Sequence, residues 1–322
     1  MSKVKRLLKA IVQLLLPVVI LLIVAMLGAS IWMLYVISEP PKAPYLVTPE
    51  KFAQLSARGA QITDEHWANE DGTDARGWLL RGNEGAPAVI LLHRYGADRS
   101  YVLNLGVKLN ETTDYTVLMP DLRAHGENPP IKYTTFSGAE INDIKSAIKF
   151  LRSAQTKSSA KLVGKKMGLY GSELGALVAL GVGAEDAEVS TMVLESVPAS
   201  SNHLLDEVIS ARYPFGSEIT SKQSEIGTYL FYYNGTYDRV PACEKAKKVA
   251  NRDVMLLAGP SAQEFQSSTS NLINCFSKAN NIKSSTDLNP TGFDLSNASL
   301  QQADGYDNRV IYFFKESLDP KP

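Results

Sequence analysis

The feature that most constrains this chain is an apolar run near its N-terminus, from Ala10 to Ile37. A membrane helix needs about 20 apolar residues, and this run is longer. A cleaved signal peptide with a cut near Ala29 is the alternative, but the apolar region of such a peptide spans only about 7–15 residues. Here the apolar residues continue past Ala29. The sequence therefore predicts one uncleaved transmembrane helix over 10–37.

The charges around this run predict its orientation. Four basic residues lie in the first nine positions, namely Lys3, Lys5, Arg6 and Lys9. Only Lys42 and Lys51 follow closely after the run. Positive residues favour the cytoplasmic side of a membrane. We therefore expect a single-pass protein of the cell membrane, with residues 1–9 in the cytoplasm and the domain after the helix outside the cytoplasm.

Composition limits the classes of partner and cofactor. The formal net charge is −1, and 44% of the residues are hydrophobic, which is typical of a globular domain and predicts no nucleic-acid partner. The two cysteines, Cys243 and Cys275, lie in no C-x-x-C or Cys/His cluster, so we expect no metal site, and no cofactor motif is present. Outside the cytoplasm the two cysteines could form a disulfide; two free thiols are the alternative.

Composition along the chain also suggests its domains. Residues 38–49 contain four prolines and predict a stiff stalk, followed by one domain over 50–322. Two segments within this domain are longer than ordinary loops. Residues 198–227 suit a small lid, and residues 261–302 form a polar insertion rich in Ser, Asn, Thr and Gln.

Apolar runs of strand length alternate with segments of helical periodicity. A hairpin is predicted where 62–67 and 75–80 flank Asp71-Gly72. Further strands are expected at 88–92, 116–119, 167–170, 190–194, 229–233 and 254–257. Helices are expected at 99–110, 138–153, 174–182, 241–250 and 306–318. This alternation predicts an α/β fold with a mainly parallel central sheet and helices on both faces. Ligands of such sheets bind beyond the carboxyl ends of the strands.

Four segments, in order, resemble motifs of the α/β-hydrolase family. Residues 167–180 resemble its strand, nucleophile elbow and helix; 91–96 its oxyanion loop; 120–126 its Asp-x-Arg-x-His-Gly segment; and 234–241 the turn that carries the triad acid. The resemblance covers roughly 62–253 and the closing helix. It implies the α/β-hydrolase fold, with Asp238 as the equivalent of the triad acid.

The register of the elbow follows from sterics. The tip residue needs small neighbours two positions before and after it. With Ser172 at the tip these neighbours would be Tyr170 and Leu174, whereas with Glu173 they are Gly171 and Gly175. We therefore predict Glu173 at the position where the family carries its nucleophile. The resemblance then places the oxyanion-hole donors at Tyr95 and Leu174.

The histidine of the family's triad has no equivalent in the sequence, because none occurs between the last predicted strand and the closing helix. The four histidines are His66, His93, His125 and His203. Without a histidine the predicted acid has nothing to orient, so Asp238 is also interpreted as a turn residue. We expect the pocket to be bordered by His93, Arg94, Ser172 and His125. The opposite charges of Arg94 and Glu173 predict a direct ion pair that fills the space of an acyl substrate. In the alternative, Arg94 points to solvent and Glu173 bonds only to backbone N–H groups at the N-terminus of its helix.

Three functions are compatible with these observations. The first is a catalytically degenerate protein that binds a small-molecule or protein ligand at the cell envelope. The second is a hydrolase of esters, amides or halides that uses Glu173 as its nucleophile, by analogy with relatives such as haloalkane dehalogenases, which use an aspartate. The third is an interaction protein that uses 198–227 and 261–302 and has no function for the pocket.

Overall fold

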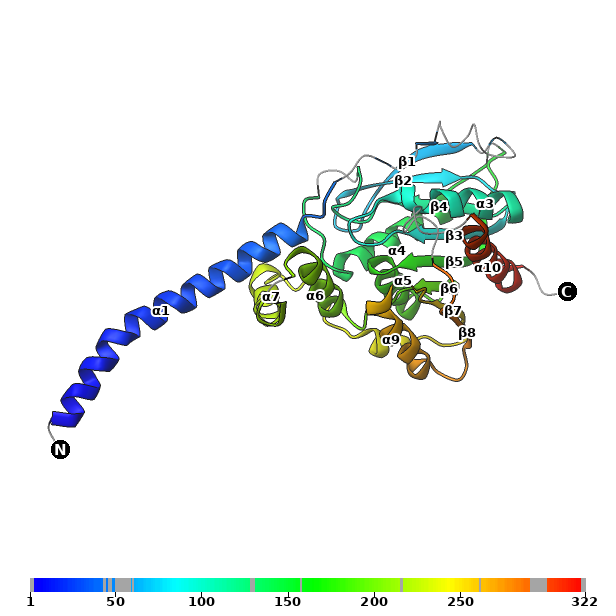
Figure 1. Ribbon diagram of the computed structural model, residues 1–322. Helices are drawn as coiled ribbons and strands as arrows, with labels where there is room; N and C mark the ends of the chain where they lie inside the picture. Colours follow the sequence, from blue (N-terminus) through cyan, green and yellow to red (C-terminus); the bar gives the residue numbers. More distant parts are fainter. Residues whose placement is uncertain are drawn as a thin grey trace.

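The structure is a computed structural model. It describes residues 3–42, 45, 48–49, 59, 61–127, 131–156, 158–214, 217–260, 262–289 and 300–319. A long helix, α1 (Lys3–Ser38), leads into a layered α/β domain (Figure 1). From Leu8 to Ser38, α1 is long and apolar enough to span a membrane.

The centre of the domain is an eight-stranded sheet of order β1-β2-β4-β3-β5-β6-β7-β8. The strands are β1 (Ile62–Ala68), β2 (Asp74–Leu80), β3 (Ala86–Leu92), β4 (Thr116–Pro120), β5 (Val163–Ser172), β6 (Val189–Glu195), β7 (Asp253–Leu257) and β8 (Asn281–Ser285). Strand β2 pairs antiparallel with β1 and β4, and the other pairs are parallel. The mainly parallel sheet predicted from the sequence is confirmed.

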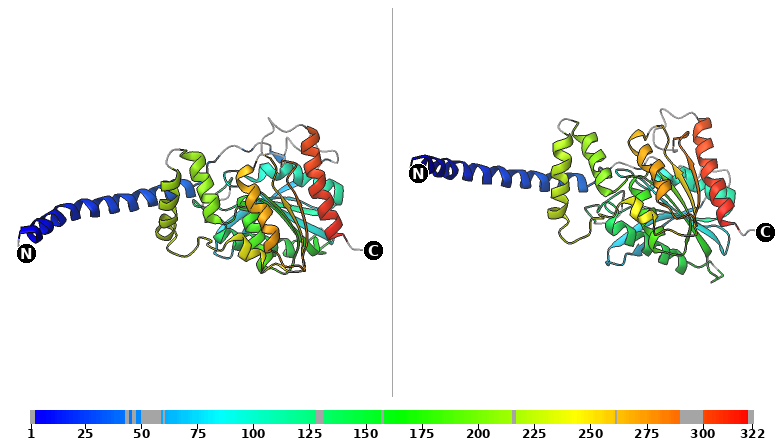
Figure 2. Two further views of the ribbon diagram at one scale, coloured as in Figure 1. Left: turned by 60° about the horizontal axis from the view of Figure 1, so that its bottom comes forward. Right: turned by 90° about the horizontal axis from the view of Figure 1, so that it is seen from below.

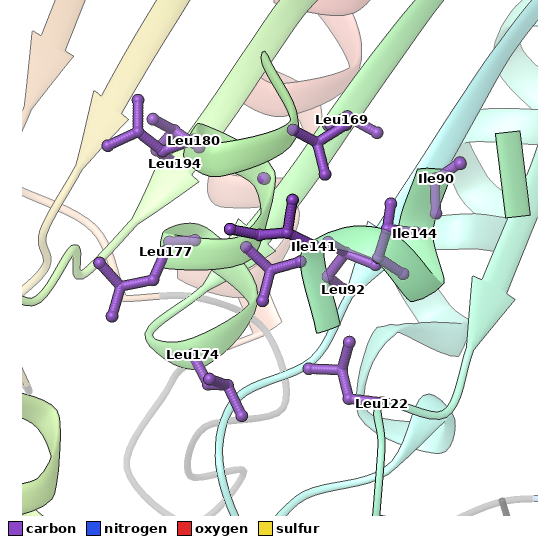
Figure 3. Packing of buried hydrophobic residues seen from close by; sticks show 14 of the residues in the cluster. Ile90, Leu92, Leu122, Ile141, Ile144, Leu169, Leu174, Leu177, Leu180 and Leu194 are labelled. Carbon is purple, nitrogen blue, oxygen red and sulfur yellow. The ribbon is translucent and has the colours of Figure 1, made fainter. Parts of the chain in front are cut away.

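Helices cover both faces of the sheet because its central strands are apolar on both sides. In β3, Ile90 and Leu92 pack in one core cluster, while Val89 and Leu91 pack in the other. The first cluster includes α4 (Gly138–Ser153) and α5 (Leu174–Glu185), as Figure 3 shows. The second includes α3 (Leu103–Thr113) and α10 (Leu300–Leu318). The remaining helices among the described residues are η1 (Arg99–Val102), α6 (Ser201–Arg212), α7 (Ser217–Phe231), α8 (Ala242–Ala246), α9 (Gln263–Leu272) and η2 (Ile273–Cys275).

The described part of the segment predicted as a stiff stalk packs on the domain. Burial begins inside α1, where Leu34 and Ile37 are buried. The carbonyl of Ser38 accepts a 2.8 Å hydrogen bond from the Thr134 amide. Further on, the Tyr45 hydroxyl donates to Asp121 at 3.0 Å. The apolar side chains at the end of the helix are thereby removed from water, so the described part of 38–49 does not stand away from the domain.

One predicted strand is absent from the structure, and two other segments have elements that differ from the expectation. Residues 229–233, predicted as a strand, include the end of α7 and the turn after it. The polar insertion 261–302 contains α9 and η2 as well as the edge strand β8, whose pairing with β7 the sequence did not predict. In addition, α8 is shorter than the helix expected over 241–250.

The two cysteines form a disulfide. Cys243 of α8 is bonded to Cys275 of η2, and their Cα atoms are 5.2 Å apart. The alternative of two free thiols is therefore wrong. The bond closes a loop that contains β7 and α9, and it links two elements at the same side of the sheet.

Candidate functional site

The sharpest turn of the domain joins β5 to α5, and Glu173 lies at its tip. Its φ is 47° and its ψ is −105°, a left-handed conformation that a side chain rarely adopts. A Cβ atom at Gly171 would collide with the carbonyl of Gly175. The small residues thus permit the tight turn, and in the structure Glu173, rather than Ser172, lies at its tip.

The loop after β3 meets this turn. A Cβ atom at Gly175 would lie 2.6 Å from the carbonyl oxygen of Leu92 and 2.7 Å from that of His93. Such a close backbone approach requires glycine. The two turns at which the sequence places Tyr95 and Leu174 therefore converge at the carboxyl ends of the parallel strands β3 and β5.

Where the turns meet, the structure has a cavity of about 570 Å³. Its walls come from the β3 loop, the tip of the β5–α5 turn, helix α6 and the start of α9. The lining residues are Pro41, Arg94, Tyr95, Glu173, Leu204, Glu207, Val208, Ala211, Arg212, Glu264 and Phe265. The cavity combines apolar walls with acidic and basic side chains, the usual composition of a ligand site.

Glu173 contributes a buried, strongly perturbed carboxyl to this cavity. Burial raises the pKa of its carboxyl to about 7, and the positive charge of Arg94 lowers it against that trend. The side chain is 8% exposed. Desolvation disfavours the charged form of a carboxyl, so Glu173 exchanges a proton near neutral pH.

The direct ion pair predicted between Arg94 and Glu173 is not formed. Within the described part of the chain, no hydrogen bond or ion pair joins the two, and their attraction acts at longer range. The Arg94 guanidinium instead lies over the Tyr101 ring, 5.4 Å from its centroid. Contact with an aromatic face stabilises a guanidinium.

Ser172 lies apart from the cavity. It is the last residue of β5, pairs with Glu195 of β6, and is buried. Its hydroxyl has no hydrogen-bond partner among the residues that the structure describes, and it does not line the cavity. Of the residues expected around the pocket, Ser172 is therefore one that the structure does not bring to it.

His93 and His125 are buried behind the β3 loop. Nε2 of His93 accepts a hydrogen bond of 3.0 Å from the Leu122 amide, and its Nδ1 lies 2.8 Å from the Arg94 carbonyl. Nδ1 of His125 lies 2.8 Å from the Arg123 carbonyl. Burial lowers the pKa of His93 to about 4 and that of His125 to about 3. Both rings are therefore neutral at physiological pH, and neither lines the cavity.

The other two histidines are also outside the cavity lining. His66 is exposed on β1. His203 belongs to α6, where its Nδ1 accepts a hydrogen bond of 3.0 Å from the Ala199 amide. All four histidines of the chain lie in described residues, so none of them contacts Glu173 as the base of a triad would.

The prediction that Asp238 occupies the position of the triad acid was wrong. No strand precedes it, because 229–233 is not a strand, and it lies before β7 rather than at a strand's carboxyl end. It lines a different cavity from Glu173. Its carboxylate forms a buried ion pair with Lys245 and accepts a 2.6 Å hydrogen bond from Ser137. Asp238 therefore joins the turn to α4 and α8.

A buried polar network that was not predicted from the sequence lies behind the turn. The Tyr306 hydroxyl donates to Glu195 at 3.1 Å and lies 3.0 Å from the Tyr170 hydroxyl. Burial raises the pKa of Glu195 to about 7. Glu195 directly follows the predicted strand 190–194, and this position was the signal in the sequence that could have identified it. The described residues contain no group of three His, Cys, Asp or Glu side chains that could hold a metal.

Comparisons with known proteins agree with this architecture. No protein-family model matches the chain, and no curated protein matches it. Among solved structures, the Pyrococcus furiosus esterase Pf2001 has 22% identity over 88% of this chain and 99% of its own, with a TM-score of 0.65. The dienelactone hydrolase of Anabaena variabilis has 13% identity over 81% of this chain and 99% of its own, with a TM-score of 0.56. The chain has the α/β-hydrolase fold.

Proposed function

We propose that this chain is a single-pass membrane protein whose extracytoplasmic domain is catalytically degenerate and binds a ligand in the cavity at Glu173. One observation carries the proposal: a glutamate stands at the tip of the β5–α5 turn, the equivalent of the nucleophile elbow, and none of the chain's four histidines lines the cavity beside it.

Acyl transfer by a serine needs an exposed hydroxyl and an adjacent base. The hydroxyl next to the tip, that of Ser172, is buried outside the cavity. The buried rings of His93 and His125 have pKa values far below neutrality and use ring nitrogens in contacts with the backbone. These side chains support the loops of the site and do not activate a nucleophile.

The cavity nevertheless remains suited to binding. Its volume of about 570 Å³ lies within the usual range of roughly 300–1,000 Å³ for small-molecule sites. Leu204 and Val208 of α6 offer apolar contact, while Glu173 and Arg94 offer opposite charges. The cavity therefore complements a ligand that has an apolar body and a polar end. Such a ligand is a small molecule or a side chain of a protein partner.

The anchor and the disulfide support the proposed location. From Leu8 to Ser38, α1 is apolar enough to cross a bilayer, and its four basic residues lie before this stretch or at its first turn. A disulfide between Cys243 and Cys275 suits an oxidising compartment outside the cytoplasm. Both observations agree with a cytoplasmic N-terminus and an extracytoplasmic domain.

Hydrolysis with Glu173 as the nucleophile is the second candidate, favoured by the position of its carboxylate on the cavity wall. Attack on an ester, amide or halide would form a covalent acyl- or alkyl-enzyme through Glu173, with expulsion of the leaving group. A pKa of about 7 leaves much of the carboxyl protonated at neutral pH. Hydrolysis of the intermediate also needs a base, and no histidine lines the cavity.

Turnover assays separate the two candidates. The full chain, purified in lipid nanodiscs, would be offered panels of esters, amides and haloalkanes, with Glu173→Gln as the matched control. The binding function predicts product formation equal to that of the control, together with saturable binding of a ligand that protects the cavity. Turnover, or a covalent mass increase on Glu173, that disappears in Glu173→Gln would establish the hydrolase instead.

A further inference from the structure

The exposed part of α1 has the length of one bilayer crossing. From Leu8 to Ala29 the side chains are exposed, and burial against the domain begins at Ser30. These 22 positions extend over roughly 33 Å at 1.5 Å per residue. The hydrocarbon core of a bilayer is about 30 Å thick. The domain therefore begins where the membrane would end.

Helix α7 lies at this boundary. A Cβ atom at Gly227 would be 3.1 Å from the Ser30 carbonyl oxygen and 3.3 Å from a methyl carbon of Leu34. Figure 2 shows α7 lying across α1 where α1 meets the domain, with α6 on the domain side. Thus α7 is the part of the domain nearest to the exposed stretch of α1.

The open side of α7 is unusually apolar for a helix that faces water. Its buried face carries the small residues Ser224, Gly227 and Thr228. Its open face, and the turn that continues it, carry four large apolar or aromatic residues: Ile226, Tyr229, Leu230 and Tyr233 are 54%, 60%, 42% and 87% exposed. Their spacing of i, i+3, i+4 and i+7 puts them on one side. Exposure of such an apolar face to water is unfavourable in free energy.

The surroundings of this face are those of a membrane interface. The Arg239 guanidinium lies 3.6 Å from the centroid of the Tyr229 ring. On the neighbouring end of α1, Tyr35 is exposed and its ring lies 4.8 Å from the Lys132 ammonium. Tyrosine rings, and basic side chains that reach the headgroups, concentrate at this level of a bilayer.

We propose that the open face of α7 docks into the headgroup–acyl boundary of the bilayer that α1 crosses. The inference rests on the membrane anchor of the proposed function. Continuity with α1 identifies lipid as the occupant, because a spanning α1 brings the bilayer surface to within one or two residues of Ser30. Since α7 packs on α6, and α6 lines the cavity through Leu204 and Val208, docking holds the lid at the lipid surface.

Site-specific quenching tests the docking. Both native cysteines are in the disulfide, so an introduced cysteine is the single free thiol. Tyr229→Cys and Tyr233→Cys in the full chain would be labelled with an environment-sensitive fluorophore and placed in phosphatidylcholine nanodiscs, with or without acyl chains that carry a shallow nitroxide. Tyr312→Cys, at a site 64% exposed on α10, is the matched control, and Leu22→Cys reports on the span.

Docking predicts that nitroxide lipids reduce the fluorescence at positions 229, 233 and 22 and leave it unchanged at 312. Quenching at 22 with no more quenching at 229 and 233 than at 312 would overturn the docking while leaving the anchor intact. Absence of quenching at 22 would overturn the anchor itself, and the docking with it. Cross-linking of position 229 to a second copy, without lipid quenching, would assign the face to self-association and also overturn the proposal.

Discussion

The hydroxyl of Tyr95 donates a 2.5 Å hydrogen bond to the backbone carbonyl of Ile37. Tyr95 lines the cavity at Glu173, and Ile37 lies in the last turn of α1. The bond therefore connects the wall of the candidate site to the helix proposed as the membrane anchor. The Tyr95 ring is also stacked on Phe136, with centroids 5.7 Å apart, which fixes the direction of the hydroxyl.

Removal of this hydroxyl should loosen the end of α1. Tyr95→Phe leaves the buried Ile37 carbonyl without its donor, and an unsatisfied buried group costs about 1–3 kcal/mol. We expect a lower free energy of unfolding, measured by denaturant titration of the full chain in nanodiscs. Tyr312→Phe, at an exposed site, controls for the substitution. Equal stability of the two variants would contradict the proposed connection.

The buried end of α1 should behave as part of the domain core. Leu34→Ala removes a fully buried side chain, and such changes typically cost about 2–5 kcal/mol. Leu22→Ala changes an exposed position of the same helix and should leave the stability of the domain within about 0.5 kcal/mol of the parent. Thermal unfolding of the domain provides the comparison. A similar shift in both variants would mean that α1 contributes nothing specific to the core.

Glu173 should make stability depend on pH in a defined direction. Its pKa is raised from 4.5 to about 7, so the folded state holds the proton more tightly than the unfolded state does. The favourable contribution is complete below pH 4.5 and is lost as pH rises through 7. Glu173→Gln lacks this titration. Relative to the parent, the variant should therefore gain up to roughly 3 kcal/mol between pH 4.5 and pH 8.

This difference isolates Glu173, because the buried histidines are common to both proteins and their titration cancels. Glu207→Gln is the control, since Glu207 lines the same cavity and is more exposed, with 39% of its side chain accessible. Unfolding of the three proteins would be followed across this pH range. A stability difference between Glu173→Gln and the parent that does not change with pH would contradict the raised pKa.

Local sterics made the central features predictable from the sequence. Gly171 and Gly175 fix the register of the turn, because no larger residue fits beside the backbone there. The apolar run of β3 likewise predicts a strand buried on both faces. The long apolar helix was predictable from length and composition.

The errors have a different origin, in contacts between distant segments. The segment 229–233 is rich in aromatic residues, which favour a strand by propensity. In the structure its first residues belong to α7, a helix that packs against the distant α1. The assignment of Asp238 to the triad acid depended on that strand and failed with it. Strand β8 is mostly polar and half-exposed, so it has no apolar pattern that predicts a strand. Only its pairing with β7 in the structure identifies it.

The most direct test of the central claim is labelling by a serine-directed fluorophosphonate, read by intact mass. The full chain and Glu173→Ser would be compared with an active serine esterase as the positive control. Ser172 is buried outside the cavity, and no histidine lines the cavity. We therefore predict no adduct on the parent chain. Glu173→Ser should also show neither rapid stoichiometric labelling nor ester turnover, since a serine at the tip would still lack its base. Stoichiometric labelling of Ser172, or ester hydrolysis by Glu173→Ser, would contradict the account.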